Sequence, residues 1–266
     1  MQLHEVVVID FLTKLFEEGH GYSSINCARS ALSSFLSSEA GLTIGNFPSV
    51  IRFMKGIYEL KPPVPKYTCI WDVNIVLNYL KLLGPNENLT LFCLSHKLLM
   101  LLALTSGQRA QTLHKIDVRN INFGENGVII PITELIKQSN PNKPNKFSLH
   151  LKPLGECPEI CVVQALKVYL NKTKCLRNSS SKLFISSVKP HNPISKDTVS
   201  RWLKTVLFEA GVETEIFTAH STRAAKASKD YYNGLKVEEI MKQVGLSSNK
   251  TFQRHYNKVL IMESCG

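Results

Sequence analysis

The stretch that decides the fold is residues 101–121, "LLALTSGQRAQTLHKIDVRNI". It begins as a strongly apolar helix and stops at Gly107, because glycine readily adopts the left-handed conformation in which helices end. Arg109 follows two residues later, and the chain then resumes with apolar spacing. The pattern therefore predicts a sharp break between two buried segments, with an always-charged guanidinium held rigidly in the break. Two interpretations of Arg109 stay open: an anion ligand, or a buried arginine paired with an acid such as Asp117.

A second stretch, residues 217–228, "FTAHSTRAAKAS", places an imidazole and a guanidinium at the start of a predicted helix. His220 and Arg223 are three residues apart and share a helix face. His220 could be a helix cap or a core histidine, or the pair could bind a phosphate. Arg109 and Arg223 together could bind the two non-bridging oxygens of a phosphodiester. They would then stabilise the charge that develops on those oxygens in a pentacoordinate transition state.

Tyr256, in "NKTFQRHYNK" (residues 249–258), is a candidate nucleophile. Attack by its hydroxyl would form a phosphotyrosine ester, which conserves the bond energy, and His220 could manage the proton. Lys137 is a candidate acid for the leaving 5′-oxygen, since nearby arginines lower the pKa of a lysine. Taken singly, Tyr256 could be a packing aromatic and Lys137 a solvated hairpin lysine. The scheme needs no metal and no small-molecule cofactor.

The charge of the chain favours an anionic partner. Its 266 residues include 32 Lys and Arg against 21 Asp and Glu, a formal net charge of +11 with a pI near 9.3. Such a field attracts nucleic acid first and an anionic membrane surface second; a basic protein without an anionic partner is the alternative. No apolar run reaches the ~20 residues that span a bilayer. The N-terminus lacks the basic region of a signal peptide, so we expect an intracellular protein.

Seven cysteines are scattered along the chain, and Cys157 and Cys161 form the one suggestive pair. A zinc site requires a second such pair or a nearby pair of histidines. We therefore interpret this segment as a helix entry at Pro158 and predict no metal site.

Prolines 62, 63 and 65, in "KPPVPKY", mark a domain boundary because they favour a stiff, extended segment. Residues 1–61 are predicted to be a small helical domain, with helices over 5–19, 23–41 and 47–60, the second capped by its serines. About sixty residues is marginal for independent stability, which suggests help from a partner such as DNA or a missing upstream helix.

Residues 66–266 are predicted to be mostly α-helical with one small antiparallel β-sheet. The β-rich region covers 119–154, with a turn at 124–127 and alternation over 147–151. The predicted helices cover 71–84, 90–107, 160–170, 196–211, 220–234, 236–245 and 247–262.

These stretches together resemble the tyrosine recombinases, also called the phage-integrase family. Residues 101–121 resemble the first family box, "AHSTRAAKAS" (219–228) its H-x-x-R box, and "GLSSNKTFQRHY" (245–256) the terminal box. The resemblance covers roughly residues 66–260. Within the family the chain is most similar to enzymes of eukaryotic mobile elements of the DIRS, Ngaro and Crypton kind, which show similar "GQRAQTLH", "FTAHSTRAA" and "ISKDTVSRWLK" segments.

The resemblance implies a role for each matched position. Arg109 and Arg223 would bind the phosphate, His220 would be the box histidine, and Tyr256 would be the nucleophile. Lys137 would be the hairpin lysine, with Lys143 and Lys146 as neighbours that could take its place. Further DNA contacts are expected, with less support, from other basic residues: Lys143, Lys146, Arg201, Lys226, Lys250 and Arg254.

The resemblance also implies an activity and partners. The expected enzyme is a DNA recombinase working through a 3′-phosphotyrosine intermediate, active as a homotetramer on two double-stranded DNA sites. Residues 1–61 would be a core-binding domain of SAM-like type, and the expected location is the nucleus.

Three positions depart from the family pattern. Leu246 stands where the family usually has His or Trp, Ala224 where many bacterial relatives have a second His, and Thr112 where an acid is common. Leucine cannot donate a hydrogen bond to a phosphate, a loss of about 1–3 kcal/mol. A catalytically weakened or domesticated DNA-binding protein of the same fold is therefore the alternative, and a type IB topoisomerase-like relaxase is a weaker one.

Overall fold

The computed structural model of the chain describes residues 3–36, 43–64, 67–136, 147–177, 179–246 and 248–261. The chain separates into two compact units, Met1–Lys66 and Tyr67–Gly266. The division falls beside the proline-rich segment, where proline rings and missing N–H groups prevent a helix from continuing.

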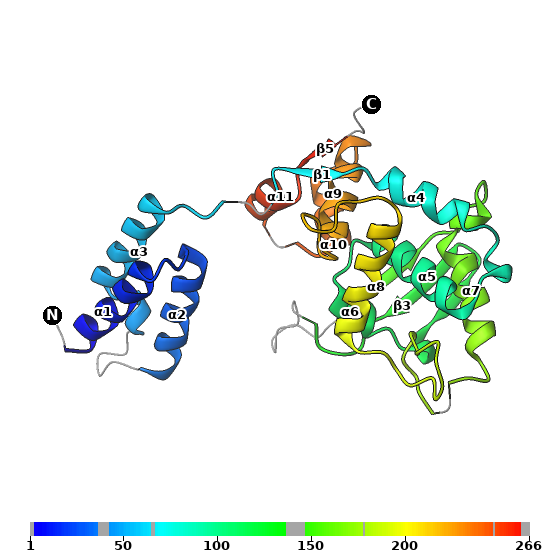
Figure 1. Cartoon of the computed structure of the whole chain (residues 1–266), viewed down its shortest axis with the longest axis horizontal. Helices are drawn as coiled ribbons and strands as arrows, with labels where there is room; N and C mark the ends of the chain where they lie inside the picture. Colours follow the sequence, from blue (N-terminus) through cyan, green and yellow to red (C-terminus); the bar gives the residue numbers. More distant parts are fainter. Residues whose placement is uncertain are drawn as a thin grey trace. The chain divides into compact units, whose positions relative to one another are not determined.

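The first unit is helical over the part that the structure describes (Figure 1). Its elements are α1 (Leu3–Glu17), α2 (Tyr22–Phe35), the 3-10 turn Ile44–Asn46 and α3 (Pro48–Leu60). Leu12, Ile25 and Val50, one from each helix, are fully buried and form its core. The predicted serine cap of the second helix is wrong, because α2 begins one residue earlier, after Gly21, and has no side-chain cap. The predicted end of that helix, at 41, lies outside the described residues.

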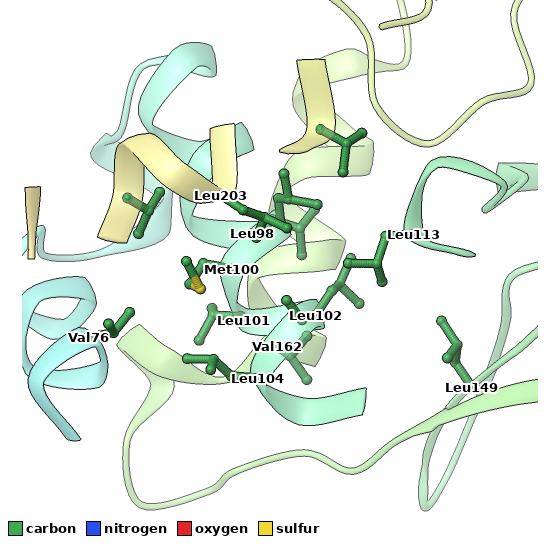
Figure 2. Close-up of a cluster of buried hydrophobic side chains, with 14 of the residues drawn as sticks. Val76, Leu98, Met100, Leu101, Leu102, Leu104, Leu113, Leu149, Val162 and Leu203 are labelled. Carbon is green, nitrogen blue, oxygen red and sulfur yellow. The ribbon is translucent and has the colours of Figure 1, made fainter. Parts of the chain in front are cut away.

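The second unit is built around α5 (Leu91–Ser106), which is buried continuously from Leu94 to Leu104. Thr90 begins this helix by accepting a hydrogen bond from the Cys93 N–H, a normal N-cap arrangement. Figure 2 shows its leucines within a cluster of buried hydrophobic side chains that the surrounding elements also supply. These elements are α4 (Val73–Leu82), α7 (Val162–Thr173), α8 (Lys196–Glu209) and β4 (Ser148–Leu151).

The predicted antiparallel sheet is present. Strands β2 (Asn122–Gly124), β3 (Gly127–Pro131) and β4 form one sheet in the order β2-β3-β4. Val128 and Ile130 of β3 are buried while Ile129 between them is exposed, as expected where one face of a sheet lies on a core.

A second, two-stranded parallel sheet was not predicted. Strand β1 (Cys69–Trp71) pairs with β5 (Val259–Ile261), in a register that places Cys69 opposite Val259. The predicted bounds of the two helices next to these strands are therefore wrong: one helix begins later than expected and the other ends earlier. The helix expected from 71 begins at Val73, after the side chain of Asp72 caps it. The helix expected over 247–262 is only α11 (Asn249–His255), because Tyr256 leaves the helical conformation and the chain then becomes extended.

The remaining helices of the second unit are α6 (Ala110–His114), α9 (Ser221–Tyr232) and α10 (Val237–Val244). The fold class predicted from the sequence, mostly α with a small antiparallel sheet, is confirmed. Among the described residues, no helix combines the length and the apolar character that crossing a membrane requires.

Candidate active site

Arg223, in the first turn of α9, joins three separate segments of the second unit. Its side chain is 1% exposed. Its Nε donates to the Tyr256 hydroxyl at 3.1 Å, one terminal nitrogen to the Gly107 carbonyl at 3.0 Å, and the other to the Gly245 carbonyl at 3.3 Å. The planar, forked guanidinium is suited to serving several acceptors at once. The arrangement brings the ends of α5, α10 and α11 to a single cation.

Gly107 ends α5 in the left-handed conformation, with φ +62°. A Cβ at this position would meet Cγ1 of Val244 at 2.5 Å, so only glycine allows α10 to approach this closely. The next residue, Gln108, is buried, and its amide donates to the Gln243 carbonyl at 2.7 Å. These contacts fix the backbone that leads into Arg109.

Arg109 is the residue that precedes α6, with an extended backbone at φ −74° and ψ 151°. Its side chain is half-buried. Burial, the largest cause, lowers the pKa of Arg223 from its usual value, and the positive charge of Arg109 adds to that lowering. The Arg223 guanidinium binds the Gly107 carbonyl, two residues before Arg109, and so lies at the break after α5.

The acid suggested for Arg109 has another partner. Asp117 accepts hydrogen bonds from the guanidinium and the backbone N–H of Arg119. This interaction holds the pKa of Asp117 at about 2. Within the described part of the chain, Arg109 forms no ion pair. The interpretation of Arg109 as the partner of Asp117 is therefore wrong.

Tyr256 is the C-terminal cap residue of α11. It is 6% exposed and belongs to the main hydrophobic core. Its ring centroid lies 5.3 Å from the central guanidinium carbon of Arg223. Tyr256 thus packs in the core, as the simpler interpretation expects, and also places its hydroxyl on the arginine.

His220 is exposed and immediately precedes α9. It occupies the N-cap position of α9, although its side chain makes no capping hydrogen bond, and it does not lie in the core, so the interpretation as a core histidine is wrong. The following residue, Ser221, is fully buried and accepts a hydrogen bond from Nε1 of Trp71 at 2.9 Å. Strand β1 thereby fixes the start of the helix that carries Arg223.

The other basic candidates have mixed positions. Lys137, Lys143 and Lys146 lie outside the described residues. Arg201, Lys250 and Arg254 are exposed. Lys226 is half-buried and its ammonium group is paired with Asp230, which makes it a poor phosphate ligand.

Leu246 is half-buried and packs against the main core. It follows Gly245, which ends α10 with φ +67°, and its backbone N–H donates to the Met241 carbonyl at 2.8 Å. Leu246 therefore completes the hydrogen bonds at the end of α10, and its side chain has no hydrogen-bond donor.

Ser228 is one of the polar residues of the site that sequence reasoning missed. It is fully buried on α9, and its hydroxyl hydrogen-bonds the backbone on both sides of Asn257. The carbonyls of Gly107 and Gly245 were also not predicted as acceptors for Arg223. Every residue has a backbone carbonyl, so the sequence does not indicate which of them will bind a side chain.

Nothing in the described part of the chain groups three or more His, Cys, Asp or Glu side chains as a metal site would. Cys161 instead accepts a hydrogen bond from the Leu154 N–H, and both it and Cys157 are free thiols.

The fold of the second unit is that of the tyrosine-recombinase catalytic domains. The model of the phage integrase family matches residues 82–261, and the chain belongs to this family. A search of curated proteins gives no significant match to the sequence.

Solved structures show the same fold at low identity. XerH site-specific recombinase in a post-cleavage complex with its difH substrate has a TM-score of 0.60 at 14% identity, covering 93% of this chain and 67% of that chain. The integrase of transposon Tn1549, in complex with transposon right-end DNA, has a TM-score of 0.63 at 14% identity, covering 94% and 79%. XerA recombinase has a TM-score of 0.53 at 16% identity, covering 97% and 88%.

Proposed function

We propose that this chain is a site-specific DNA recombinase that cuts and rejoins DNA through a 3′-phosphotyrosine intermediate. The observation that carries the proposal is the hydrogen bond from Nε of Arg223 to the Tyr256 hydroxyl, with the same guanidinium bound to the Gly107 carbonyl, two residues before Arg109. Family membership supports it independently. The sequence similarity to DIRS, Ngaro and Crypton enzymes favours an origin in a mobile element and a nuclear location.

In the proposed cleavage step, the Tyr256 oxygen attacks the phosphorus and the 5′-oxygen of the next nucleotide leaves. His220 accepts the tyrosine proton, and Lys137 supplies a proton to the leaving oxygen. Arg109 and Arg223 stabilise the negative charge on the non-bridging oxygens. One P–O bond forms as another breaks, so a free 5′-hydroxyl can reverse the step and rejoin a strand without an energy source.

The proposed reaction requires the site to open. Arg223 is 1% exposed and Tyr256 6% exposed, so a phosphodiester has no access to either in this arrangement. Arg109 and His220 are more accessible and would meet the DNA first. We propose that the described arrangement is a closed resting state, and that productive DNA binding uncovers Arg223 and Tyr256 together, with the hydrogen bonds that attach Tyr256 to α9 kept.

The proposed partner is double-stranded DNA, bound by a homo-oligomer that is tetrameric when two sites are joined. The net charge of +11 supports this, because phosphate contacts dominate affinity for DNA. Binding should weaken steeply with salt, by roughly 10³-fold or more between 50 and 200 mM if six or more phosphates are contacted.

A second candidate is a DNA-binding protein of this fold that no longer cleaves. Two observations favour it: Leu246 offers no hydrogen-bond donor, and the candidate nucleophile is buried. Such a protein would keep the basic surface and the salt-dependent binding.

The test is covalent trapping with a pool of nicked duplexes that carry a randomised central segment. Cleavage near the nick releases a short strand that diffuses away with the 5′-hydroxyl needed for rejoining. The covalent adduct therefore accumulates. We expect the wild-type chain to form an adduct that survives SDS, with the DNA attached to Tyr256 by peptide mass spectrometry and a shared sequence among the trapped duplexes. Tyr256→Phe should form none, whereas Tyr232→Phe, a matched change at an exposed tyrosine, should keep it.

Each other outcome selects another function. Salt-dependent binding of the pool with no adduct supports the non-cleaving protein. Adducts without any shared sequence, together with relaxation of supercoiled plasmid, support a topoisomerase-like relaxase. An adduct on a residue other than Tyr256 overturns the proposed assignment of the nucleophile.

A further inference from the structure

The turn that follows α11 is held by one buried hydroxyl. Ser228 is fully buried on α9, one and a half turns after Arg223. Its Oγ donates a hydrogen bond to the Tyr256 carbonyl and accepts one from the Lys258 N–H at 3.1 Å. A serine hydroxyl has one donor and two acceptor sites, so it can bridge a carbonyl and an N–H in this way.

The Tyr256 carbonyl needs such a partner. It belongs to the C-cap residue of α11, and carbonyl groups at a helix C-terminus have no intrahelical N–H to accept from. The N–H groups of Tyr256 and Asn257 both donate to the Phe252 carbonyl, and these two bonds end α11. Because Tyr256 is 6% exposed, water has little access to its backbone, and Ser228 satisfies the carbonyl instead.

Lys258 adds a second fixed point to the same turn. Its side chain is 9% exposed, and its Nζ donates to the Arg254 carbonyl in the last turn of α11 at 2.7 Å. Burial, and then the Arg254 charge, lower the pKa of this amine. Two side chains thus fix the backbone from Arg254 to Lys258. Lys258 binds a carbonyl within this segment, and Ser228 binds the segment to α9.

We propose that Ser228 is a positioning residue for Tyr256, and that α9 holds the tyrosine at both ends. Arg223 binds the hydroxyl through Nε, and Ser228 binds the main chain of the same residue. Both groups belong to one helix, so the distance between the two attachment points is set by a rigid element. The inference rests on the proposed function, because a fixed tyrosine matters for rate only if Tyr256 attacks DNA.

The expected effect on rate is large because an attacking atom must be placed closely. A displacement of about 1 Å at the reacting atoms lowers a rate by roughly 100-fold. Without the Ser228 hydroxyl the turn after α11 loses both of its bonds to α9, while Arg223 still binds the phenol. We therefore expect loss of chemical rate at saturating DNA and an unchanged affinity for DNA.

The test compares Ser228→Ala with Ser95→Ala and Ser228→Thr in the full chain. Ser95 is a matched control because it is also fully buried, and its hydroxyl bonds a backbone carbonyl, that of Leu91 within α5. Ser228→Thr keeps the hydroxyl. Three quantities are measured: amide hydrogen exchange at Lys258 without DNA, melting temperature, and the single-turnover rate of adduct formation on the duplex recovered from the randomised pool.

We expect Ser228→Ala to speed exchange at Lys258 and to slow adduct formation by about 10- to 100-fold at saturating DNA, with the half-saturating DNA concentration unchanged. Ser95→Ala, whatever its effect on the melting temperature, should change neither the exchange at Lys258 nor the rate of adduct formation. Ser228→Thr should recover most of the rate.

Two results overturn the proposal: an adduct rate for Ser228→Ala equal to that of wild type, or a rate loss matched by Ser95→Ala, which would mark a general effect of stability. If the wild-type chain forms no adduct with any duplex, the recombinase proposal fails. The role of Ser228 in positioning Tyr256 is then tested by hydrogen exchange at Lys258 alone. Faster exchange at Lys258 in Ser228→Ala then supports the positioning role, and unchanged exchange overturns it.

Discussion

The Gly107 carbonyl accepts a hydrogen bond from Arg223 at 3.0 Å, although 116 positions separate the two residues in the chain. The bond joins the end of α5 to α9, the helix whose Arg223 and Ser228 bind Tyr256. The loop that carries Arg109 is thereby supported by the other arginine of the site. Substitutions of Arg223 should therefore affect folding as well as chemistry.

Arg223→Lys should destabilise the second unit strongly. One ammonium group cannot replace the guanidinium fork, and losing the bonds to the buried Tyr256 hydroxyl and the buried Gly107 carbonyl costs about 1–3 kcal/mol each. We expect a loss of about 3 kcal/mol or more in urea unfolding. Arg201→Lys, at an exposed arginine of α8, should change stability by no more than about 0.5 kcal/mol. Equal effects of the two changes would contradict the bridging role of Arg223.

Gly107→Ala should be more costly than a substitution at another glycine with positive φ. Gly211 has φ +85°, and a Cβ at that position would have no other atom within 4 Å, so Gly211→Ala should cost only about 1 kcal/mol of backbone strain. At Gly107 the new Cβ would also meet Val244 at 2.5 Å, which adds about 1–3 kcal/mol of overpacking.

The double substitution Gly107→Ala with Val244→Ala isolates that contact. Removing the valine methyls relieves the clash, so the double variant should be more stable than the sum of the two single losses by about 1 kcal/mol or more. Chemical denaturation of the four proteins measures this coupling, and strict additivity would show that the close approach has no energetic effect.

Ser221→Ala should destabilise the chain by about 1–3 kcal/mol, because it leaves the buried Nε1–H of Trp71 without its acceptor. Trp71 and Trp202 are the two tryptophans of the chain, so intrinsic fluorescence follows this site closely. Ser200→Ala removes a hydroxyl that bonds only the Lys196 carbonyl within α8, and its effect should stay below about 0.5 kcal/mol. Loss of stability in the control equal to that in Ser221→Ala would count against the role assigned to the Trp71 bond.

Asp117 should make stability depend on acid pH. Its pKa is held at about 2 in the folded state, mainly by the hydrogen bond from Arg119, against roughly 3.9 in an unfolded chain. A lowered folded pKa means that the contribution is fully present above about pH 4 and is lost as the pH falls toward 2. We expect a loss of about 1–2 kcal/mol across that window, measured by urea unfolding at each pH.

Asp117→Asn is the variant that tests this assignment. It should flatten the stability profile between pH 4 and pH 2, since amide groups do not titrate there. A profile in this variant as steep as that of wild type would assign the acid sensitivity to other carboxyl groups.

The sequence predicted elements whose signals are local. Helix ends at Gly107 and Gly245 follow from the left-handed conformation that glycine allows, and both residues adopt it. The helix expected over 47–60, which is α3 from Pro48, and the alternation over 147–151, where β4 lies, are local signals of the same kind. The fold class followed from these signals and from the order of the boxes.

Features set by distant contacts were not predictable in this way. Residues 259–261 are apolar and continue a helical pattern, yet they form a strand because β1 is available as a partner. The role of Ser228 depends on the turn it contacts, 28 residues away, and a single serine in a helix carries no signal of that. The pairing of Arg223 with the Gly107 carbonyl is likewise a property of the folded chain alone.

The parallel pairing of Cys69 with Val259 has a consequence for the order of assembly. Contacts between residues far apart in sequence form late, because closing a long loop costs entropy before the contact is gained. During synthesis the ribosome releases β1 long before Tyr256 and β5 emerge. A nascent chain therefore has no assembled Tyr256 site, and the proposed reaction with DNA becomes possible only once β5 has docked on β1.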